Sequence, residues 1–516
     1  MSKQTQFVSV IKAKIEKYTN YSEVIEDGNV ISISDGVAIV SGLDNIMYNE
    51  LVKFENGTLG IALNLNTDYV GVILLGKHED IQENSKVVRT KKVVSVPVGD
   101  ELIGRVINPL GVGIDGKKKI VTKKTMPIEK TAPGVMTRES VNEPLQTGIL
   151  AIDAMFPIGK GQRELIIGDR QTGKTTIALD TIINQKGKDV KCVYVAIGQK
   201  NATVSQIVRT LYANECMSYT TVVSATASDT TALQYIAPYS GMAIAEEWLS
   251  NGENVLIVLD DLTKHANAYR TISLLLRRPP GREAYPGDVF YLHSRLLERA
   301  CKLNAKYSGG SITALPIVET QANDISAYIP TNIISITDGQ LFLQSEAFNE
   351  GQRPAIDISL SVSRVGSAAQ TKAIKKNSNS LKLQLAQYND VKSFSKFSSD
   401  LDPETLLIIE HGSRVMEMIK QPANSQYTQT EEAIILQSIS TKLIKFIPIE
   451  HIKEFISGYL KTCRETIMYK VIESEKRIDD SVNDSLLKTL KKFIKQYIVS
   501  ISKYDITKYG REEELE

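Results

Sequence analysis

The chain has 516 residues, of which 42% are hydrophobic and 23% charged, and this length exceeds what a single hydrophobic core usually supports. Its 61 Lys and Arg residues nearly balance 60 Asp and Glu residues, so the formal net charge is +1. A dedicated nucleic-acid binder is expected to be strongly basic, and the sequence therefore argues against one. The widely spaced cysteines indicate neither a zinc cluster nor a disulfide framework and fit a reducing compartment; they are Cys192, Cys216, Cys301 and Cys463.

The N-terminal segment predicts an amphipathic helix and not an export signal. Phe7, Ile11 and Ile15 recur at helical spacing with charged residues between them, and the continuous apolar core of a signal peptide is missing. We therefore predict a helical arm over residues 1–25, which either covers its own core or docks on a partner. No sequence window approaches the roughly 20 consecutive apolar residues that cross a bilayer, so membrane attachment is expected only through partners.

Residues 26–95 predict a small β-barrel. Short runs of β-branched residues alternate there with turn residues, a spacing typical of an all-β domain. The clearest predicted strands are Val30–Ile33, Val37–Val40, Val70–Leu74 and Val93–Val96.

Residues 96–375 predict a nucleotide-binding domain of the α/β class. Continuous apolar runs alternate with helical patterns, as expected for a parallel sheet that helices cover on both faces. These runs are Leu165–Ile167, Cys192–Ile197 and Val255–Leu259.

Residues 376–516 predict a helical domain, because strand patterns end near Lys375 and apolar residues recur at helical spacing along 486–501. The most loop-like stretch at this boundary is Lys375–Ser380.

A phosphate loop follows the first of the apolar runs. In such a loop the backbone amides surround the β-phosphate, Lys174 reaches the β- and γ-oxygens, and the Thr175 hydroxyl is offered to magnesium. A glycine-rich turn that merely joins a strand to a helix would not require Gly173, Lys174 and Thr175 in this order. The predicted nucleotide-binding residues of the loop are Gly168, Asp169, Arg170, Gln171, Thr172, Gly173, Lys174 and Thr175.

The other polar groups of the site are expected at the ends of neighbouring strands. The run Val255–Leu259 leads into Asp260 and Asp261; we favour Asp260 for the magnesium side together with Thr175, because Asp261 could simply cap the next helix. The strand beside the loop ends in Gln199, which can orient water but cannot accept a proton as a carboxylate does. The sequence leaves open both weak hydrolysis and binding without turnover.

Four longer strings resemble the alpha subunits of the F-type (proton-translocating) ATP synthase, and the resemblance extends over nearly the whole chain. The abundance of Lys, Asn and Ile also fits an AT-rich bacterial genome, such as that of a mollicute. The resemblance implies an α/β central RecA-like phosphate-loop domain, an N-terminal six-stranded β-barrel and a C-terminal α-helical bundle. The strings are Gln162–Thr175, Val222–Ser228, Leu274–Asp288 and Pro354–Gln370.

The resemblance implies a non-catalytic, regulatory site for ATP or ADP with Mg²⁺, because the catalytic beta subunits typically carry Glu where Gln199 stands. It also implies that Arg364, after a strand predicted over Ile358–Val362, reaches the phosphates of a neighbouring beta subunit as an arginine finger, with Ser361 holding that geometry. Without the resemblance, an interface ion pair would be the favoured role of Arg364.

Arg353 and Gln421 match family positions near the adenine of the bound nucleotide. The family commonly follows this Gln closely with a second one, whereas here extra residues separate Gln421 from Gln426. Contact between Gln426 and the base therefore stays an open question.

As partners, the resemblance implies the beta subunit in an alternating ring, the gamma central stalk, and delta with the peripheral stalk through the N-terminal arm. The membrane sector would be reached indirectly, at the cytoplasmic face of the bacterial cell membrane, and ATP synthesis would be driven by a proton gradient. The loop Pro279–Gly287 would be a bearing surface toward the stalk, or else a plain connecting loop.

Three other functions compete with this interpretation. A Rho-type RNA motor would need clustered aromatics in the barrel, which offers only Tyr48, Phe54 and Tyr69. A self-sufficient ATPase would be favoured by a carboxylate in place of Gln199. An alpha-like paralogue in another rotary machine cannot be separated from a synthase subunit by these residues.

Overall fold

The protein is described by a computed structural model that covers residues 27–76, 79–395, 402–501 and 504–510. The predicted arm at 1–25 lies outside these residues. The described chain forms two compact units, one built from residues 27–94 with Leu274–Arg277 and the other from the remainder. No helix of the described residues combines the length and the hydropathy that spanning a bilayer requires.

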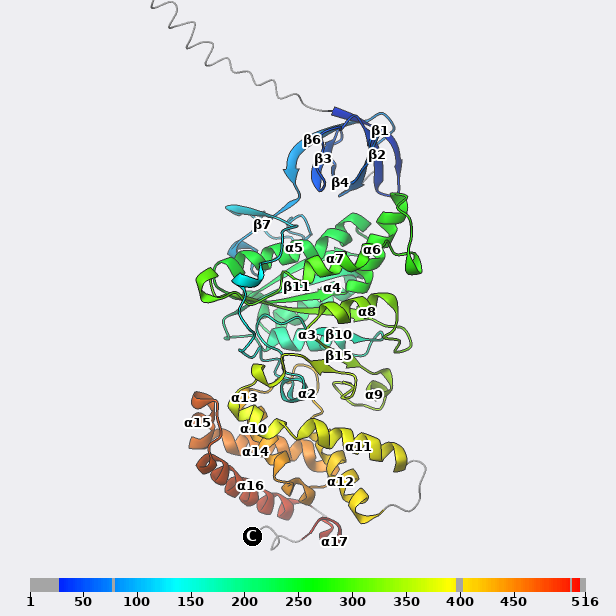
Figure 1. The fold of residues 1–516 in the computed structure, drawn as a ribbon. Helices are drawn as coiled ribbons and strands as arrows, with labels where there is room; N and C mark the ends of the chain where they lie inside the picture. The colour runs from blue at the N-terminus through cyan, green and yellow to red at the C-terminus, as the bar shows by residue number, and fades with distance from the viewer. Residues whose placement is uncertain (1–26, 77–78, 396–401, 502–503, 511–516) are drawn as a thin grey trace, which may run out of the picture. The chain divides into compact units, whose positions relative to one another are not determined.

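The first unit is a closed barrel of six antiparallel strands in the order β1-β2-β5-β4-β3-β6, which confirms the predicted barrel (Figure 1). Its interior is filled by β-branched and aromatic side chains, among them Val40, Val52 and Phe54, which are at most 1% exposed. The strands are β1 (Asp27–Ser34), β2 (Val37–Ser41), β3 (Glu50–Phe54), β4 (Leu59–Leu65), β5 (Val70–Leu74) and β6 (Lys86–Val93).

The predicted strand Val93–Val96 is wrong as a single element. Val93 ends β6, the chain leaves the barrel at Val94, and β7 (Ser95–Val98) then pairs antiparallel with β9 (Lys124–Pro127). Val93 is 41% exposed, whereas Val94 and Val96 are buried; the three valines look alike in the sequence, so its composition hides the change of sheet.

The second unit is built on an eight-stranded sheet in the order β16-β15-β10-β14-β13-β11-β12-β8. Each neighbouring pair is parallel except β15 with β16, which confirms the predicted parallel sheet. The strands are β8 (Val106–Ile107), β10 (Leu165–Gly168), β11 (Val190–Gln199), β12 (Thr220–Thr226), β13 (Asn254–Asp260), β14 (Ser311–Glu319), β15 (Gly339–Leu343) and β16 (Val362–Ser363).

Helices cover both faces of this sheet. Tyr194 of β11 shares a core with residues of α3 and α4, whereas a Cβ atom added to Gly241 of α5 would lie only 2.4 Å from Val195 on the opposite face of β11. Alternate residues of one strand therefore serve two cores. The helices are α3 (Lys174–Ile183), α4 (Asn201–Ala213), α5 (Thr231–Ser250), α6 (Leu262–Leu275), α7 (Val289–Leu297), α8 (Tyr328–Ile336) and α9 (Ser345–Asn349).

The C-terminal part of this unit is helical, as predicted, and the described residues beyond Ser363 contain no strand. Helix α16 buries Leu486, Leu490, Ile494 and Ile498 on one face. The helices of this part are α10 (Lys372–Ser378), α11 (Leu381–Ser395), α12 (Pro403–Met418), α13 (Gln429–Ser440), α14 (Ile452–Arg464), α15 (Ile467–Glu475), α16 (Asp480–Ser500) and α17 (Ile506–Tyr509). The short helix α2 (Leu150–Met155) precedes β10 in the chain.

The interpretation of Lys375–Ser380 as a loop is wrong for most of its length, because α10 continues to Ser378. Ala373 and Ile374 in the first turn of α10 are 2% exposed, so burial of this apolar pair stabilises a helix that the polar residues alone do not favour. All four cysteines of the chain are buried and free.

Candidate functional site

The phosphate loop joins β10 to α3, and α3 begins at Lys174. Gly173 has a φ of 96° and Gln171 a φ of 61°, left-handed values that turn the chain sharply ahead of the helix. The Lys174 ammonium donates to the carbonyl oxygen of Gly168 at 2.7 Å and also to that of Asp169. Burial lowers the pKa of Lys174, and nearby carboxylates, that of Glu319 first, oppose this change. The loop therefore carries a helix N-terminus and a partly buried amine side by side, an arrangement that suits anion binding.

Asp260, at the end of β13, collects the polar side chains next to the loop. Its carboxylate accepts hydrogen bonds from the Thr175 hydroxyl at 2.9 Å, the Tyr194 hydroxyl at 2.6 Å and the Gln199 amide at 2.9 Å. Asp260 is 3% exposed. The structure thus brings together three residues that the sequence singled out. Tyr194 was missed, although a hydroxyl on one face of an otherwise apolar strand is a readable signal.

Asp261 has a different environment. One of its oxygens accepts the backbone N–H of Lys264 at 2.7 Å, and the other lies 3.1 Å from the Lys264 ammonium. This is the helix-capping geometry. Burial raises the pKa of Asp261 to about 6, against the lowering effect of Lys264.

Two loop residues point their side chains elsewhere. The Asp169 carboxylate accepts hydrogen bonds from the Thr320 hydroxyl at 2.6 Å and the Asn323 backbone N–H at 3.0 Å. Arg170 has an 80% exposed side chain and forms an ion pair with Glu319. The Asp169 and Arg170 side chains therefore connect the loop to the end of β14 and to the segment that follows it.

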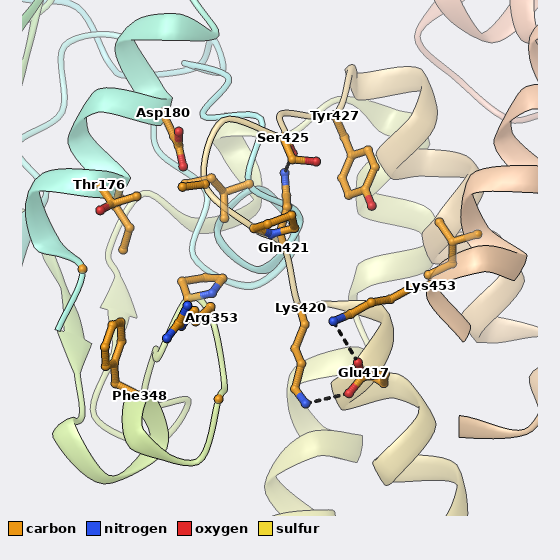
Figure 2. Close-up of a pocket in the computed structure, with 18 of the residues that line it drawn as sticks. Thr176, Asp180, Phe348, Arg353, Glu417, Lys420, Gln421, Ser425, Tyr427 and Lys453 are labelled. Atoms are coloured by element: carbon orange, nitrogen blue, oxygen red, sulfur yellow. Dashed lines mark hydrogen bonds and ion pairs between the residues drawn. The ribbon is translucent and has the colours of Figure 1, made fainter. Parts of the chain in front are cut away.

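A cavity of about 810 Å³ adjoins the phosphate loop and is lined by residues of the nucleotide-binding and helical parts of this unit (Figure 2). Gln171 and Thr176 line it from the loop and α3, while Arg353, Gln421 and Tyr427 line it from later segments. The volume falls within the range usual for small-molecule sites. The two residues predicted near the base, Arg353 and Gln421, thus share one cavity with the phosphate loop.

Contacts inside the protein hold both of these side chains. The Arg353 guanidinium lies over the Phe348 ring, 4.8 Å from its centroid. The Gln421 amide accepts from the Leu150 N–H at 3.1 Å and donates to the Gly148 carbonyl at 2.7 Å. Sequence reasoning missed Phe348, which had no pattern to indicate it.

The Arg364 segment differs locally from the prediction. Residues 358–360 form a turn, and β16 covers only Val362–Ser363, so the predicted strand Ile358–Val362 is wrong. The Asp357 carboxylate accepts the backbone N–H groups of Ser359 and Leu360, and such local bonds favour a turn over a strand.

Ser361 is fully buried and its hydroxyl accepts the Phe342 N–H at 3.0 Å. The Arg364 backbone N–H donates to the Asp338 carbonyl at 2.8 Å, while its side chain is exposed. These bonds fix the backbone of the segment on both sides of β16 and leave the guanidinium at the surface.

Comparisons with known proteins match these parts in the same order. Residues 23–91 match the β-barrel domain of the ATP synthase alpha/beta family, residues 148–363 its nucleotide-binding domain, and residues 370–493 the C-terminal domain of its alpha/beta chains. "ATP synthase subunit alpha" of Mycoplasma pneumoniae is 58% identical over 100% of this chain and 99% of the relative.

Two further relatives agree. "ATP synthase subunit alpha" of Mycoplasma genitalium is 58% identical over 99% of both chains, and that of Mycoplasmoides gallisepticum is 59% identical over 99% of both. At this identity and coverage the resemblance includes every domain and the phosphate loop. The chain therefore belongs to the ATP synthase alpha/beta family and, within it, to the alpha subunits.

Proposed function

We propose that this alpha-family chain binds ATP or ADP without turning it over and completes the catalytic site of a neighbouring beta subunit. The observation that carries this proposal is the environment of Gln199. Its amide donates to Asp260 at 2.9 Å, at the strand end where a catalytic site of this kind would hold a water-activating carboxylate. An amide in this position can orient water but cannot take its proton.

The residues present fit magnesium. The Thr175 hydroxyl and the Asp260 carboxylate lie 2.9 Å apart and offer the oxygen ligands that Mg²⁺ prefers, the remaining ones coming from phosphates and water. The described residues contain no group of three or more His, Cys, Asp and Glu side chains that could hold an ion by themselves. When bound, magnesium neutralises charge on the β- and γ-phosphates, while Lys174 and the backbone amides of the loop orient them.

The state of Arg364 supports the proposed arginine finger. Within the described part of the chain its guanidinium has no hydrogen bond and no ion pair, and its electrostatic interaction is with the buried Glu164. An exposed guanidinium on a fixed backbone is free to contact a neighbouring subunit. Placed at the charge that develops during phosphoryl transfer, it can be worth about 10³ to 10⁵ in rate.

The proposed assembly follows from membership in the family. The chain would alternate with beta in a ring around the gamma stalk, and delta with the peripheral stalk would bind the N-terminal arm. The ring would lie at the cytoplasmic face of the cell membrane, connected indirectly to the membrane sector. It would make ATP from ADP and phosphate at the beta sites, driven by a proton gradient.

The test is hydrolysis of magnesium-ATP by the purified chain, alone and after mixing with the beta and stalk subunits of the same organism. We expect no turnover by the chain alone and turnover in the mixture. Vigorous hydrolysis by the chain alone would contradict a non-catalytic site and would make Gln199 compatible with catalysis.

A further inference from the structure

Glu164 is a carboxyl group buried next to the segment that carries Arg364. It lies one residue before β10, and its side chain is 0% exposed. One carboxyl oxygen, Oε2, accepts the Gln162 amide at 2.7 Å. The other, Oε1, is buried and has no hydrogen-bond partner among the described residues. A buried polar atom without a partner costs free energy, so the position of this acid calls for an explanation.

The space for this carboxyl group is left by Gly339, at the start of β15. A Cβ atom added to Gly339 would lie 2.9 Å from Oε1 of Glu164 and closer still to Oε2, so the absence of a side chain there makes room for both oxygens. Gly339 pairs with Ser363 of β16, which directly precedes Arg364. The Gln162 amide that binds Glu164 also donates to the Ser363 hydroxyl at 3.3 Å. Glu164 is therefore held against the same short strand from which Arg364 extends.

The nearest charged groups on the other side of Glu164 are matched with each other. The Asp338 carboxylate accepts the backbone N–H of Arg163 at 3.0 Å and two guanidinium N–H groups of the same residue at 2.9 Å each. The Arg163 guanidinium also forms an ion pair with Glu298. Arg163 is therefore occupied and does not serve as a counter-ion for Glu164.

The cations of the segment around β16 differ in how they are engaged. Lys382 of α11 donates to the Ser361 carbonyl at 3.2 Å. Arg364 has an exposed side chain, its guanidinium has neither a hydrogen bond nor an ion pair in the described part of the chain, and it interacts electrostatically with Glu164. Of the cations near Glu164, Arg364 is the one that is free to approach it.

These surroundings favour the neutral form of Glu164. Burial raises the pKa of Glu164 well above its ordinary value and the Asp338 charge adds to this change, whereas the Gln162 hydrogen bond and the Arg364 charge oppose it. The carboxylate therefore forms only at a pH well above the usual range of a glutamate. Its charge then lies inside the protein, which is costly unless a cation comes close.

We propose that Glu164 is a positioning residue for Arg364. While the carboxyl group is neutral, the guanidinium is free to reach the neighbouring subunit. When the proton leaves for solvent, the carboxylate attracts the guanidinium and holds it against this chain, so turnover at the neighbouring site falls. The role of Glu164 rests on the proposed function, because it takes Arg364 to be the arginine finger.

The test is the pH profile of magnesium-ATP hydrolysis by the assembled ring, between pH values of about 6 and 9.5, with the wild-type chain and with Glu164→Gln. Glutamine has the shape of glutamate, keeps an oxygen that can accept the Gln162 amide, and stays neutral. Whatever its value at the acidic end, the ratio of variant to wild-type turnover should rise toward the alkaline end by about tenfold, the scale of one charge-assisted hydrogen bond.

A merely structural role of Glu164 would change turnover by the same factor at every pH, so a ratio that is independent of pH overturns the inference. Glu55→Gln, at an exposed position of the barrel, is the matched control, because it makes the same chemical change away from Arg364. Its ratio to wild-type turnover should be constant over the whole pH range.

Two further variants connect the effect to its cause. In an Arg364→Ala background, Glu164→Gln should change the residual turnover by the same factor at every pH, and a ratio that still rises with pH overturns the inference. Asp338→Asn removes a charge that opposes ionisation of Glu164 and frees Arg163, so the alkaline fall in turnover should move to lower pH; an unchanged profile contradicts the role of Glu164 even where Glu164→Gln does not assemble. Near-normal turnover with Arg364→Ala alone contradicts the arginine finger itself, which is a separate failure.

Discussion

Asp261 gives the chain a pH dependence of stability that a single substitution should remove. The carboxyl group is 3% exposed, and burial raises its pKa to about 6, with Asp260 adding to this effect and Lys264 opposing it. Asp261→Asn keeps an oxygen that can accept the Lys264 N–H, now at 2.7 Å, so the cap of α6 is retained. The variant differs from the wild type in the charge.

The expected magnitude follows from the two pKa values. The folded state binds the proton more tightly than the unfolded state, for which 3.8 applies, so the free energy of unfolding falls as the pH rises through the interval up to about 6. The difference between the two pKa values corresponds to about 3 kcal/mol of stabilisation at low pH. About 1 kcal/mol of this stabilisation is still present at a pH of about 5 and is lost by a pH of about 7.5. Asn does not titrate, so the variant should gain stability relative to the wild type over this range.

Differential scanning calorimetry of both proteins at these two pH values measures the effect as a change in the difference between their melting temperatures. Asp44→Asn, at an exposed position of the barrel, is the matched control and should show no such change. A difference that stays constant, or that moves against the variant as the pH rises, would refute the buried-acid reasoning.

The remaining predictions concern the phosphate loop, Arg364 and Gln421. Lys174→Ala should weaken nucleotide binding to this chain and leave appreciable turnover in the assembled ring, and complete loss of turnover with intact assembly would count against a non-catalytic site. Arg364→Ala should leave assembly and binding intact but lower ATP turnover by about 10³-fold or more; near-normal turnover would remove the finger assignment. Gln421→Ala should lower the free energy of unfolding in urea by about 1 to 3 kcal/mol, because it leaves the buried Leu150 N–H without its partner, while the Gly148 carbonyl keeps the Tyr427 N–H at 3.0 Å.

The parts of the fold that could be predicted from the sequence are those whose signal is local. A continuous apolar run such as Val255–Leu259 predicts a buried element. The order of Gly173, Lys174 and Thr175 predicts a phosphate loop that ends at the start of a helix. The prediction of a strand over Ile358–Val362 was wrong because a neighbouring side chain, which the alternation does not reveal, decides the backbone conformation. Its side-chain alternation resembles a strand, but the Asp357 carboxylate offers the backbone nearby a competing partner.

The hydrogen bonds of residues 421–427 were beyond sequence reasoning because they join distant residues. Gln426 and Asp180 are 246 positions apart, and nothing in either neighbourhood indicates the other. Asp169 is a similar case: its place in the phosphate loop predicts a role toward phosphate, whereas its carboxylate holds the Thr320 hydroxyl. Only the folded sheet, which sets β10 beside β14, brings that pair together.

The buried cysteines allow local opening of the folded chain to be measured by thiol labelling. Burial raises the pKa of Cys192 in β11 and of Cys463 in α14, so these thiols are shielded both by packing and by the scarcity of thiolate. An alkylating reagent can modify them only while the surrounding segment is transiently open. Mass spectrometry of the labelled peptides would then measure the rate of local opening in the central sheet and in the helical domain separately. The wild-type sequence suffices, because no engineered cysteine is needed.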